Sequence, residues 1–230
     1  MYYRINVILM KEKEPIIKLV DLSFAYPYRD YVFNKLNFNF YQGDRIGLLG
    51  PNGSGKTTLF QLIMGLLKPN GGKIEIFGKK RRTENDFIEV REKIGLLFQD
   101  PDDQLFSPTV AEDIAFGPLN LRKSNQETKK ILKDTLELLG LSNFEDRITY
   151  NLSYGEKRLV SMATVWAMQP KILLLDEPVT WLDEKTIAKM IQILNNNPYL
   201  SYIIISHDKK FLKETTNCIY LMDNGKINKI

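Results

Sequence analysis

Apolar residues fall into short runs along the chain, and the segments between these runs have helical spacing. The runs cover residues 45–49, 94–98, 172–175 and 202–205. Runs this short, separated by helical patterns, are typical of parallel strands that helices cover on both faces. The pattern therefore predicts an α/β fold built on a parallel sheet.

A different pattern precedes the first run. Residues 16–26 are typical of a strand, and Leu36, Phe38 and Phe40 alternate with polar residues. Alternation with a period of two indicates a half-buried antiparallel strand. We therefore expect an antiparallel β subdomain beside the parallel sheet.

The stretch between the second and third runs is mostly helical. Ser124 and Glu127 have the spacing of a capping box, and apolar residues then recur on one helical face until Gly140. Residues from about 103 to 168 thus indicate a helical insertion into the sheet.

Composition favours one globular domain. The 230 residues are 43% hydrophobic and 26% charged, and no apolar stretch approaches the roughly 18 residues that cross a bilayer. We expect an amino-terminal extension over residues 1–15, with Met10 as an alternative start, and one domain over 16–230. The single cysteine, Cys218, excludes an intrachain disulfide. Because no apolar stretch is long enough to cross a bilayer, any membrane role would come through a partner.

Charge gives no reason to expect a nucleic-acid partner. The formal net charge is only +4. The basic cluster at 79–82 follows a glycine, and we interpret it as a solvated turn.

The sequence GPNGSGKTT fits the phosphate-loop pattern G-x-x-x-x-G-K-[ST] between a strand and a helix. Its glycines let main-chain N–H groups point at phosphate oxygens, at the positive end of a helix. Lys56 is expected to contact the β- and γ-phosphates and Thr57 to bind Mg²⁺. A glycine-rich turn that only caps a helix is the simpler alternative. The predicted nucleotide-binding residues are Gly50, Pro51, Asn52, Gly53, Ser54, Gly55, Lys56, Thr57 and Thr58.

Two acidic residues follow the third run. Asp176 ends the predicted strand where the Mg²⁺ of a P-loop protein would lie, and Glu177 can act as the general base for an attacking water. One acidic residue here is usually a helix cap or a surface charge, but two in tandem favour a site. Gln99, after the second run, can contact both metal and water.

A second helix end that could bind an anion is predicted within the sequence YNLSYGEKR. Ser153 and Glu156 have capping-box spacing there, and Gly155 lies in the first turn. Such a helix end can bind an anion, although an ordinary cap has the same sequence pattern.

His207 is the only histidine, and it follows the run at 202–205. A lone histidine at a strand end is more often a surface or core residue. At this edge its imidazole can bond to a γ-phosphate and hold the attacking water in register with Glu177.

The order of these motifs, over about residues 16–230, resembles that of the ATP-binding-cassette (ABC) ATPases. GPNGSGKT matches their Walker A motif, ILLLDE their Walker B motif and LSYGE their LSGGQ signature. The resemblance makes Gln99 the Q-loop glutamine, His207 the switch histidine and Tyr26 the aromatic residue that stacks on adenine. It implies a P-loop cassette core with an antiparallel β subdomain and a helical insertion, and it implies ATP and Mg²⁺ as ligands.

The segment FQDPDDQLFSPTVAEDIAFGP, residues 98–118, is similar to the ATPases of energy-coupling-factor transporters, which include cobalt and nickel uptake systems. The chain departs from the family at Tyr154, which replaces a signature glycine. It also departs at Trp181, where small or hydroxyl residues are usual. Both departures concern communication between subunits.

The resemblance also implies partners. Two ATPase subunits, identical or related, would close head to tail, so that each site combines one chain's P-loop with the other chain's Ser153 and Gly155. A membrane subunit would dock near Gln99, which implies a place at the cytoplasmic face of the cell membrane. The implied function is ATP hydrolysis that powers uptake of a vitamin or a transition-metal ion.

Two alternatives remain at this point. A non-transport ABC ATPase of translation or DNA repair usually carries tandem cassettes or long coiled coils, and this sequence has neither. A nucleotide-binding regulator without turnover would not need Glu177.

Overall fold

The structure, a computed structural model, describes residues 14–230, so Met10 and most of the expected extension lie outside the described residues. The strands are β1 (Ile17–Ala25), β2 (Tyr31–Phe40), β3 (Arg45–Leu49), β4 (Gly71–Ile76), β5 (Lys79–Arg81), β6 (Ile94–Leu97), β7 (Ile172–Asp176), β8 (Ser201–Ile205), β9 (Cys218–Asp223) and β10 (Lys226–Lys229). The helices are α1 (Lys56–Ile63), α2 (Glu84–Lys93), α3 (Val110–Asn120), α4 (Asn125–Leu139), α5 (Tyr154–Ala167), α6 (Glu184–Asn195) and α7 (Lys209–Thr215), with short 3-10 turns η1 (Pro101–Asp103) and η2 (Thr149–Asn151).

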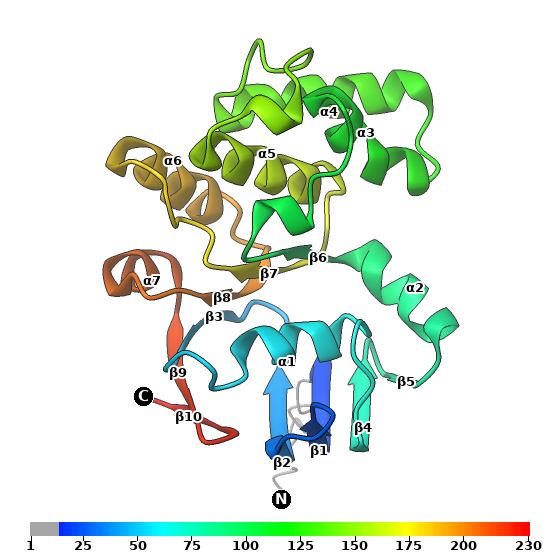
Figure 1. Ribbon diagram of the computed structural model, residues 1–230, viewed down its shortest axis with the longest axis vertical. Helices are drawn as coiled ribbons and strands as arrows, with labels where there is room; N and C mark the ends of the chain where they lie inside the picture. Colours follow the sequence, from blue (N-terminus) through cyan, green and yellow to red (C-terminus); the bar gives the residue numbers. More distant parts are fainter. Residues whose placement is uncertain (1–13) are drawn as a thin grey trace, which may run out of the picture.

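A six-stranded sheet crosses the middle of the molecule in the order β10-β9-β3-β8-β7-β6 (Figure 1). Neighbouring strands are parallel except for the β9–β10 pair. The four apolar runs form β3, β6, β7 and β8, which confirms the predicted parallel sheet. Because parallel strands end at the same edge, the polar residues that follow these runs are brought together there.

The second sheet, in the order β2-β1-β4-β5, is antiparallel and lies on the far side of α1 from the six-stranded sheet (Figure 1). In β2 the side chains of Leu36, Phe38 and Phe40 are buried and those between them are exposed. The alternation therefore gives the half-buried antiparallel strand that it predicted. Helix α1 fills the space between the sheets, and its apolar residues share one core with both.

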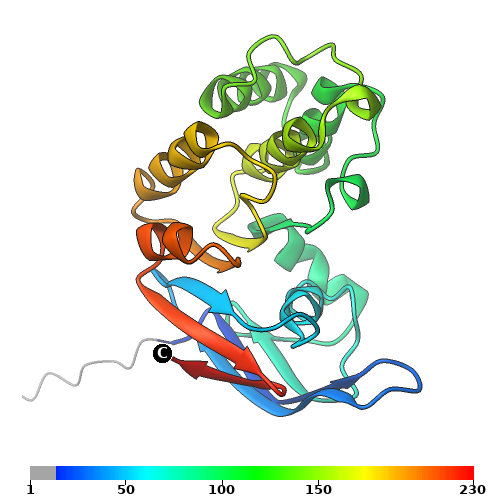
Figure 2. The same ribbon diagram turned by 60° about the vertical axis from the view of Figure 1, so that its left-hand side comes forward.

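Helices α3, α4 and α5 gather on the opposite side of the six-stranded sheet (Figures 1 and 2). The capping box predicted at Ser124 begins α4, and Gly140 ends it with a left-handed φ of 74°. Strand β7 separates two cores. Ile172 and Leu174 pack in the core that contains α1, whereas Leu173 and Leu175 pack in the core that contains α3, α4 and α5. The predicted fold class is confirmed.

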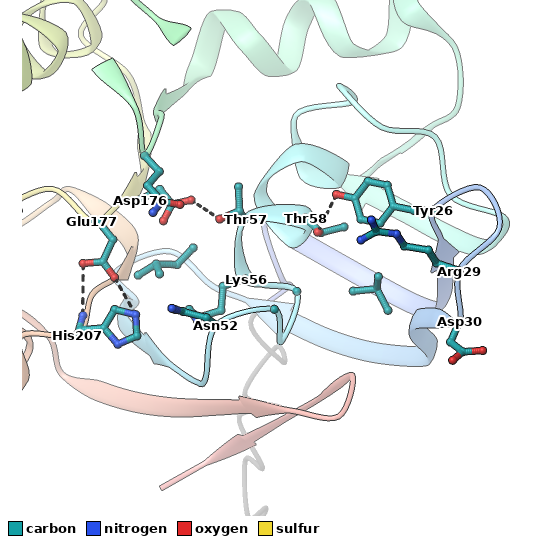
Figure 3. Close-up of a pocket in the computed structure, with 15 residues that line it drawn as sticks. Tyr26, Arg29, Asp30, Asn52, Lys56, Thr57, Thr58, Asp176, Glu177 and His207 are labelled. Atoms are coloured by element: carbon teal, nitrogen blue, oxygen red, sulfur yellow. Dashed lines mark hydrogen bonds and ion pairs between the residues drawn. The ribbon is translucent and has the colours of Figure 1, made fainter. Parts of the chain in front are cut away.

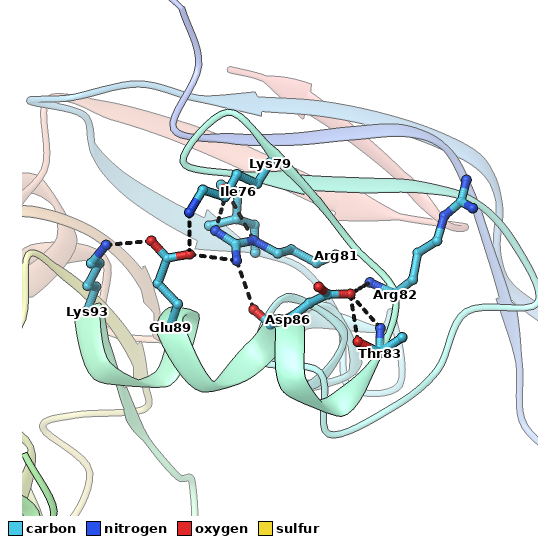
Figure 4. A network of polar contacts seen from close by, with 8 residues as sticks. All are labelled: Ile76, Lys79, Arg81, Arg82, Thr83, Asp86, Glu89 and Lys93. Carbon is cyan, nitrogen blue, oxygen red and sulfur yellow. Dashed lines mark hydrogen bonds and ion pairs between the residues drawn. The ribbon is translucent and has the colours of Figure 1, made fainter.

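The interpretation of the basic cluster as a solvated turn is wrong for Lys79–Arg81, which forms strand β5. Arg81 is only 5% exposed, and its guanidinium donates to the Ile76 carbonyl at 2.9 Å and to Glu89 at 2.9 Å (Figure 4). Side-chain hydrogen bonds, above all from Lys93, lower the pKa of Glu89 to about 2. Arg81 is buried because acceptors from β4 and α2 satisfy its donors, which the local charge pattern does not reveal.

Candidate functional site

A cleft of about 370 Å³ opens at the edge where β3, β7 and β8 end (Figure 3). Its lining consists of Tyr26, Arg29, Asp30, Val32, Asn52, Gly53, Gly55, Lys56, Thr57, Thr58, Gln99, Asp176, Glu177, Ile205 and His207. The structure thus brings together predicted site residues from five separate parts of the sequence. Gly50, Pro51 and Ser54 belong to the same loop without lining the cleft, and Ser153 and Gly155 lie outside it.

The loop between β3 and α1 leaves the amino end of α1 open. Gly55 is the N-cap with a left-handed φ of 102°, it supplies no side-chain cap, and the first turn holds no acidic residue. A Cβ on Gly55 would approach Val32 Cγ1 to 2.6 Å, so only glycine fits. The first main-chain N–H groups of α1, which lack partners within the helix, are therefore free to bind an anion.

Lys56 is held inside this loop. Its Nζ donates to the carbonyl oxygens of Gly50 at 2.8 Å and Pro51 at 2.9 Å. Burial lowers the pKa of Lys56, and the nearby carboxylates of Asp176 and Glu177 oppose that shift. The ammonium therefore lies between two carboxylates and an open helix end, where a phosphate chain would neutralise it.

Asp176 ends β7 at the wall of the cleft and is 2% exposed. Thr57 Oγ1 donates to its carboxylate at 2.6 Å (Figure 3). Burial raises the pKa of Asp176, against the effect of the Thr57 hydrogen bond. Gln99 lines the same cleft, so hydroxyl, carboxylate and amide oxygens converge. These oxygens are the ligands that Mg²⁺ prefers, and the donor set fits that ion.

Glu177 and His207 face each other across the ends of β7 and β8 (Figure 3). Glu177 Oε1 lies 3.5 Å from His207 Nε2, and Oε2 accepts from the His207 main-chain N–H at 3.4 Å. Oε1 is buried without a hydrogen-bond partner among the described residues. A buried oxygen of a cleft-lining carboxylate that makes no hydrogen bond is suited to bind and deprotonate a water molecule.

Tyr26 lies at the other end of the cleft, beside the first turn of α1. Its hydroxyl shares a hydrogen bond with Thr58 Oγ1 at 3.0 Å, and its ring packs edge-on against Phe24 at 4.9 Å. Arg29 and Asp30 also line this end and were not predicted. Their only signal in the sequence is that they follow Tyr26 in the turn between two strands.

The amino end of α5 is closed by its own residues. Ser153 Oγ accepts from the Glu156 N–H, and the Glu156 carboxylate accepts from Ser153 N and Oγ, both at 2.8 Å. This is the predicted capping box. A Cβ on Gly155 would lie 3.0 Å from the Trp181 carbonyl oxygen, and the Tyr154 and Trp181 rings lie 5.7 Å apart. The two departures from the family pattern are therefore in contact with each other.

Arg158 is a residue near the site that was not predicted. It is 1% exposed, and its guanidinium donates to main-chain carbonyls that include those of Gln99 and Glu177. Its sequence signal is the helical spacing to Met162 and Val165, both buried, which puts Arg158 on the inner face of α5.

The fold and the cleft together define a nucleotide-binding protein of the P-loop class. The chain belongs to the ABC transporter family, whose sequence pattern matches residues 33–180. It is accordingly an ATP-binding and ATP-hydrolysing subunit of a transporter. Over residues 14–230, which the structure describes, none of the helices has both the length and the apolar content to cross a membrane.

Proteins that are similar to this chain include one relative and two solved structures. The energy-coupling factor transporter ATP-binding protein EcfA of Methanocaldococcus jannaschii is 41% identical over 93% of this chain and 78% of its own. The structure of cbiO1 from Clostridium perfringens, part of the ABC transporter complex cbiONQ, has a TM-score of 0.80 at 32% identity and covers 94% of this chain and 88% of its own. A dimeric, post-hydrolysis structure of the ATP-binding cassette MJ0796 with ADP and Pi has a TM-score of 0.84 at 26% identity and covers 93% and 98%.

Proposed function

We propose that this protein hydrolyses ATP to drive an energy-coupling-factor-type uptake transporter for a vitamin or a transition-metal ion such as cobalt or nickel. The observation that carries the proposal is the convergence of Lys56, Asp176, Glu177 and His207 in one cleft beside an open helix end. The likeness to EcfA and cbiO1 supports the energy-coupling-factor type.

In this proposal the main-chain N–H groups of α1 and Lys56 hold the phosphates, and the ring of Tyr26 stacks on the adenine. Thr57, Gln99 and Asp176 would hold Mg²⁺, which would neutralise charge on the phosphates. The remaining loop residues, Gly50 to Gly55 and Thr58, shape the cradle.

Glu177 accepts a proton from the water that attacks the γ-phosphorus, and the bond to the β-phosphate oxygen breaks to give ADP and inorganic phosphate. His207 bonds to the γ-phosphate and keeps the water aligned with Glu177, 3.5 Å away. The short separation of these two side chains supports the pairing.

The working unit in this proposal is a dimer in which Ser153 and Gly155 of one chain complete the cleft of the other. Two observations support it: both residues lie outside the cleft of their own chain, and the related cassette MJ0796 is dimeric. The partner is a second copy of this chain or a related ATPase.

The membrane partner in this proposal docks beside the Q-loop. Phe106 is 68% exposed and Phe116 is 50% exposed, and their rings stack edge-on at 4.9 Å close to Gln99 in sequence. An exposed aromatic pair of this kind fits an apolar segment of an integral membrane subunit. The protein would then be a peripheral subunit at the cytoplasmic face of the membrane.

The test has two parts. Glu177→Gln should bind ATP normally and lose turnover by at least about 100-fold; near wild-type turnover would contradict the hydrolytic site. Co-expression with an energy-coupling-factor membrane subunit and purification in detergent should yield a complex that Phe106→Asp prevents from forming. Co-purification with ribosomes or DNA instead would support a non-transport ABC ATPase.

A further inference from the structure

Arg158 lies at an unusual place for a charged side chain. It is 1% exposed, and each of its hydrogen-bond acceptors is a main-chain carbonyl, those of Phe98, Gln99, Asp176 and Glu177. Burial lowers the pKa of Arg158 to about 10, and nearby Asp176 opposes that shift, so the guanidinium remains protonated. A buried charge is tolerated only where hydrogen bonds replace its hydration, and here the carbonyls do so for both terminal nitrogens, whereas Nε has no partner among the described residues.

The four carbonyls belong to two functional segments. Phe98 and Gln99 follow β6, Asp176 ends β7 and Glu177 follows it. One planar guanidinium therefore fastens the ends of two neighbouring parallel strands to helix α5.

The main chain of Glu177 needs such support. Its φ is +49°, in the left-handed region that non-glycine residues avoid. Its N–H donates to the Ile205 carbonyl at 2.9 Å, and its own carbonyl accepts from Arg158. Both main-chain groups of Glu177 are thus fixed, and the direction of its carboxylate depends on them.

Helix α5 and the loop after β6 are also tied together elsewhere. Lys157 pairs with Asp102 at 2.6 Å, and Gln104 donates to the Ser161 carbonyl at 2.8 Å. A displacement of α5 would therefore carry the loop with it. Among these three α5 residues, Arg158 is the one whose bonds also reach Glu177.

We propose that Arg158 is a positioning residue that orients the Glu177 carboxylate and transmits the position of the amino end of α5, with Ser153 and Gly155, to it. The inference rests on the proposed role of Glu177. A merely structural role would instead lower stability without a specific loss of turnover.

The first experiment compares two buried arginines. Arg158→Lys keeps the charge, but an ammonium cannot reach two pairs of carbonyls with a planar fork. We expect kcat to fall about 10- to 100-fold while binding of a fluorescent ATP analogue stays within about threefold. Arg81→Lys is the matched control. Arg81 is also buried and donates to a main-chain carbonyl, but it lies in the antiparallel subdomain. It should lower the melting temperature and leave kcat within about twofold.

The second experiment is a double-mutant cycle with Glu177→Gln, read by single-turnover hydrolysis of radiolabelled ATP. If Arg158 acts through Glu177, Arg158→Lys should cause no further loss in the Glu177→Gln background. Losses that multiply would overturn the inference, as would equal kcat values for Arg158→Lys and Arg81→Lys. Near wild-type turnover of Glu177→Gln alone would instead overturn the proposed function. If Arg158→Lys does not fold, Arg158→Gln, which keeps two N–H donors, takes its place with the same expected results.

Discussion

Helices α1 and α5 both begin after a short polar loop, yet their amino ends are in opposite states. The end of α1 has Gly55 as its N-cap, with no side-chain cap and no acid in the first turn. The end of α5 is closed by the Ser153–Glu156 box, and Glu156 is also paired with Arg147 at 2.7 Å. Both ends carry the same positive dipole, so the difference comes from which residues occupy the first turn.

Under the proposed function, the difference corresponds to two kinds of anion site. The α1 end has unpaired donors and a lysine, so it can take phosphate from solution within its own chain. At α5 the Glu156 carboxylate already accepts from Ser153 N and Oγ, so under the proposed function a phosphate must compete with Glu156 for Ser153. Under the same proposal, a site completed by α5 would suit a phosphate that a second chain already holds in place.

The test of this comparison with the largest expected effect mixes two inactive variants of the protein. Lys56→Ala damages the α1 end, and Ser153→Arg fills the α5 end. If the two ends meet across a dimer, the mixed dimer contains one intact site and one doubly damaged site, and ATPase activity should return. Subunit exchange is verified first by pulling down one tagged variant with the other. Exchange without recovery would contradict the shared site, provided that a mixed Glu177→Gln dimer shows that one competent site suffices.

The second test concerns the chemistry at the α1 end. His207→Ala should lower kcat by about 10- to 100-fold, with a smaller effect on ATP affinity, because the proposed contact strengthens as charge develops on the γ-phosphate. Steady-state kinetics and analogue binding separate these effects. An unchanged kcat with a raised KM would make His207 a ground-state binding residue only.

The third test separates capping from binding at α5. Ser153→Ala and Ser124→Ala each remove the Ser of a capping box, and each should lower the free energy of unfolding by about 1 kcal/mol in urea titrations. Only Ser153→Ala should also lower the ATPase rate. Equal ATPase rates for the two variants would make the α5 box an ordinary cap.

The smallest effect is a pH dependence of stability. Main-chain hydrogen bonding from Ser153 lowers the pKa of Glu156 from its ordinary value of 4.5. The folded state thus favours the carboxylate, and this stabilisation is present above pH 4.5 and lost as the pH falls through the lower folded value. Wild type should unfold at a higher urea concentration than Glu156→Gln at pH 7, and the difference should shrink on acidification. A constant difference would contradict this origin.

Much of the fold and of the candidate site follows from local sequence. The short apolar runs predict the strands β3, β6, β7 and β8, and the two-residue alternation in β2 predicts which of its faces is buried. The capping boxes at Ser124 and Ser153 follow from spacing alone, because each bond spans only three residues. For the same reason the conformation of the phosphate loop depends on its own glycines.

Tertiary structure decided what depends on distant partners. The sequence puts Glu177 and His207 thirty positions apart, and only the parallel pairing of β7 with β8 places their side chains 3.5 Å apart. Arg81 belongs to the basic cluster whose sequence indicates a solvated turn, and the helical spacing of Arg158 predicts an inward-facing position but not its acceptors. Both arginines are buried because carbonyls from other elements satisfy their donors, and no residue pattern within one helix or strand specifies such acceptors.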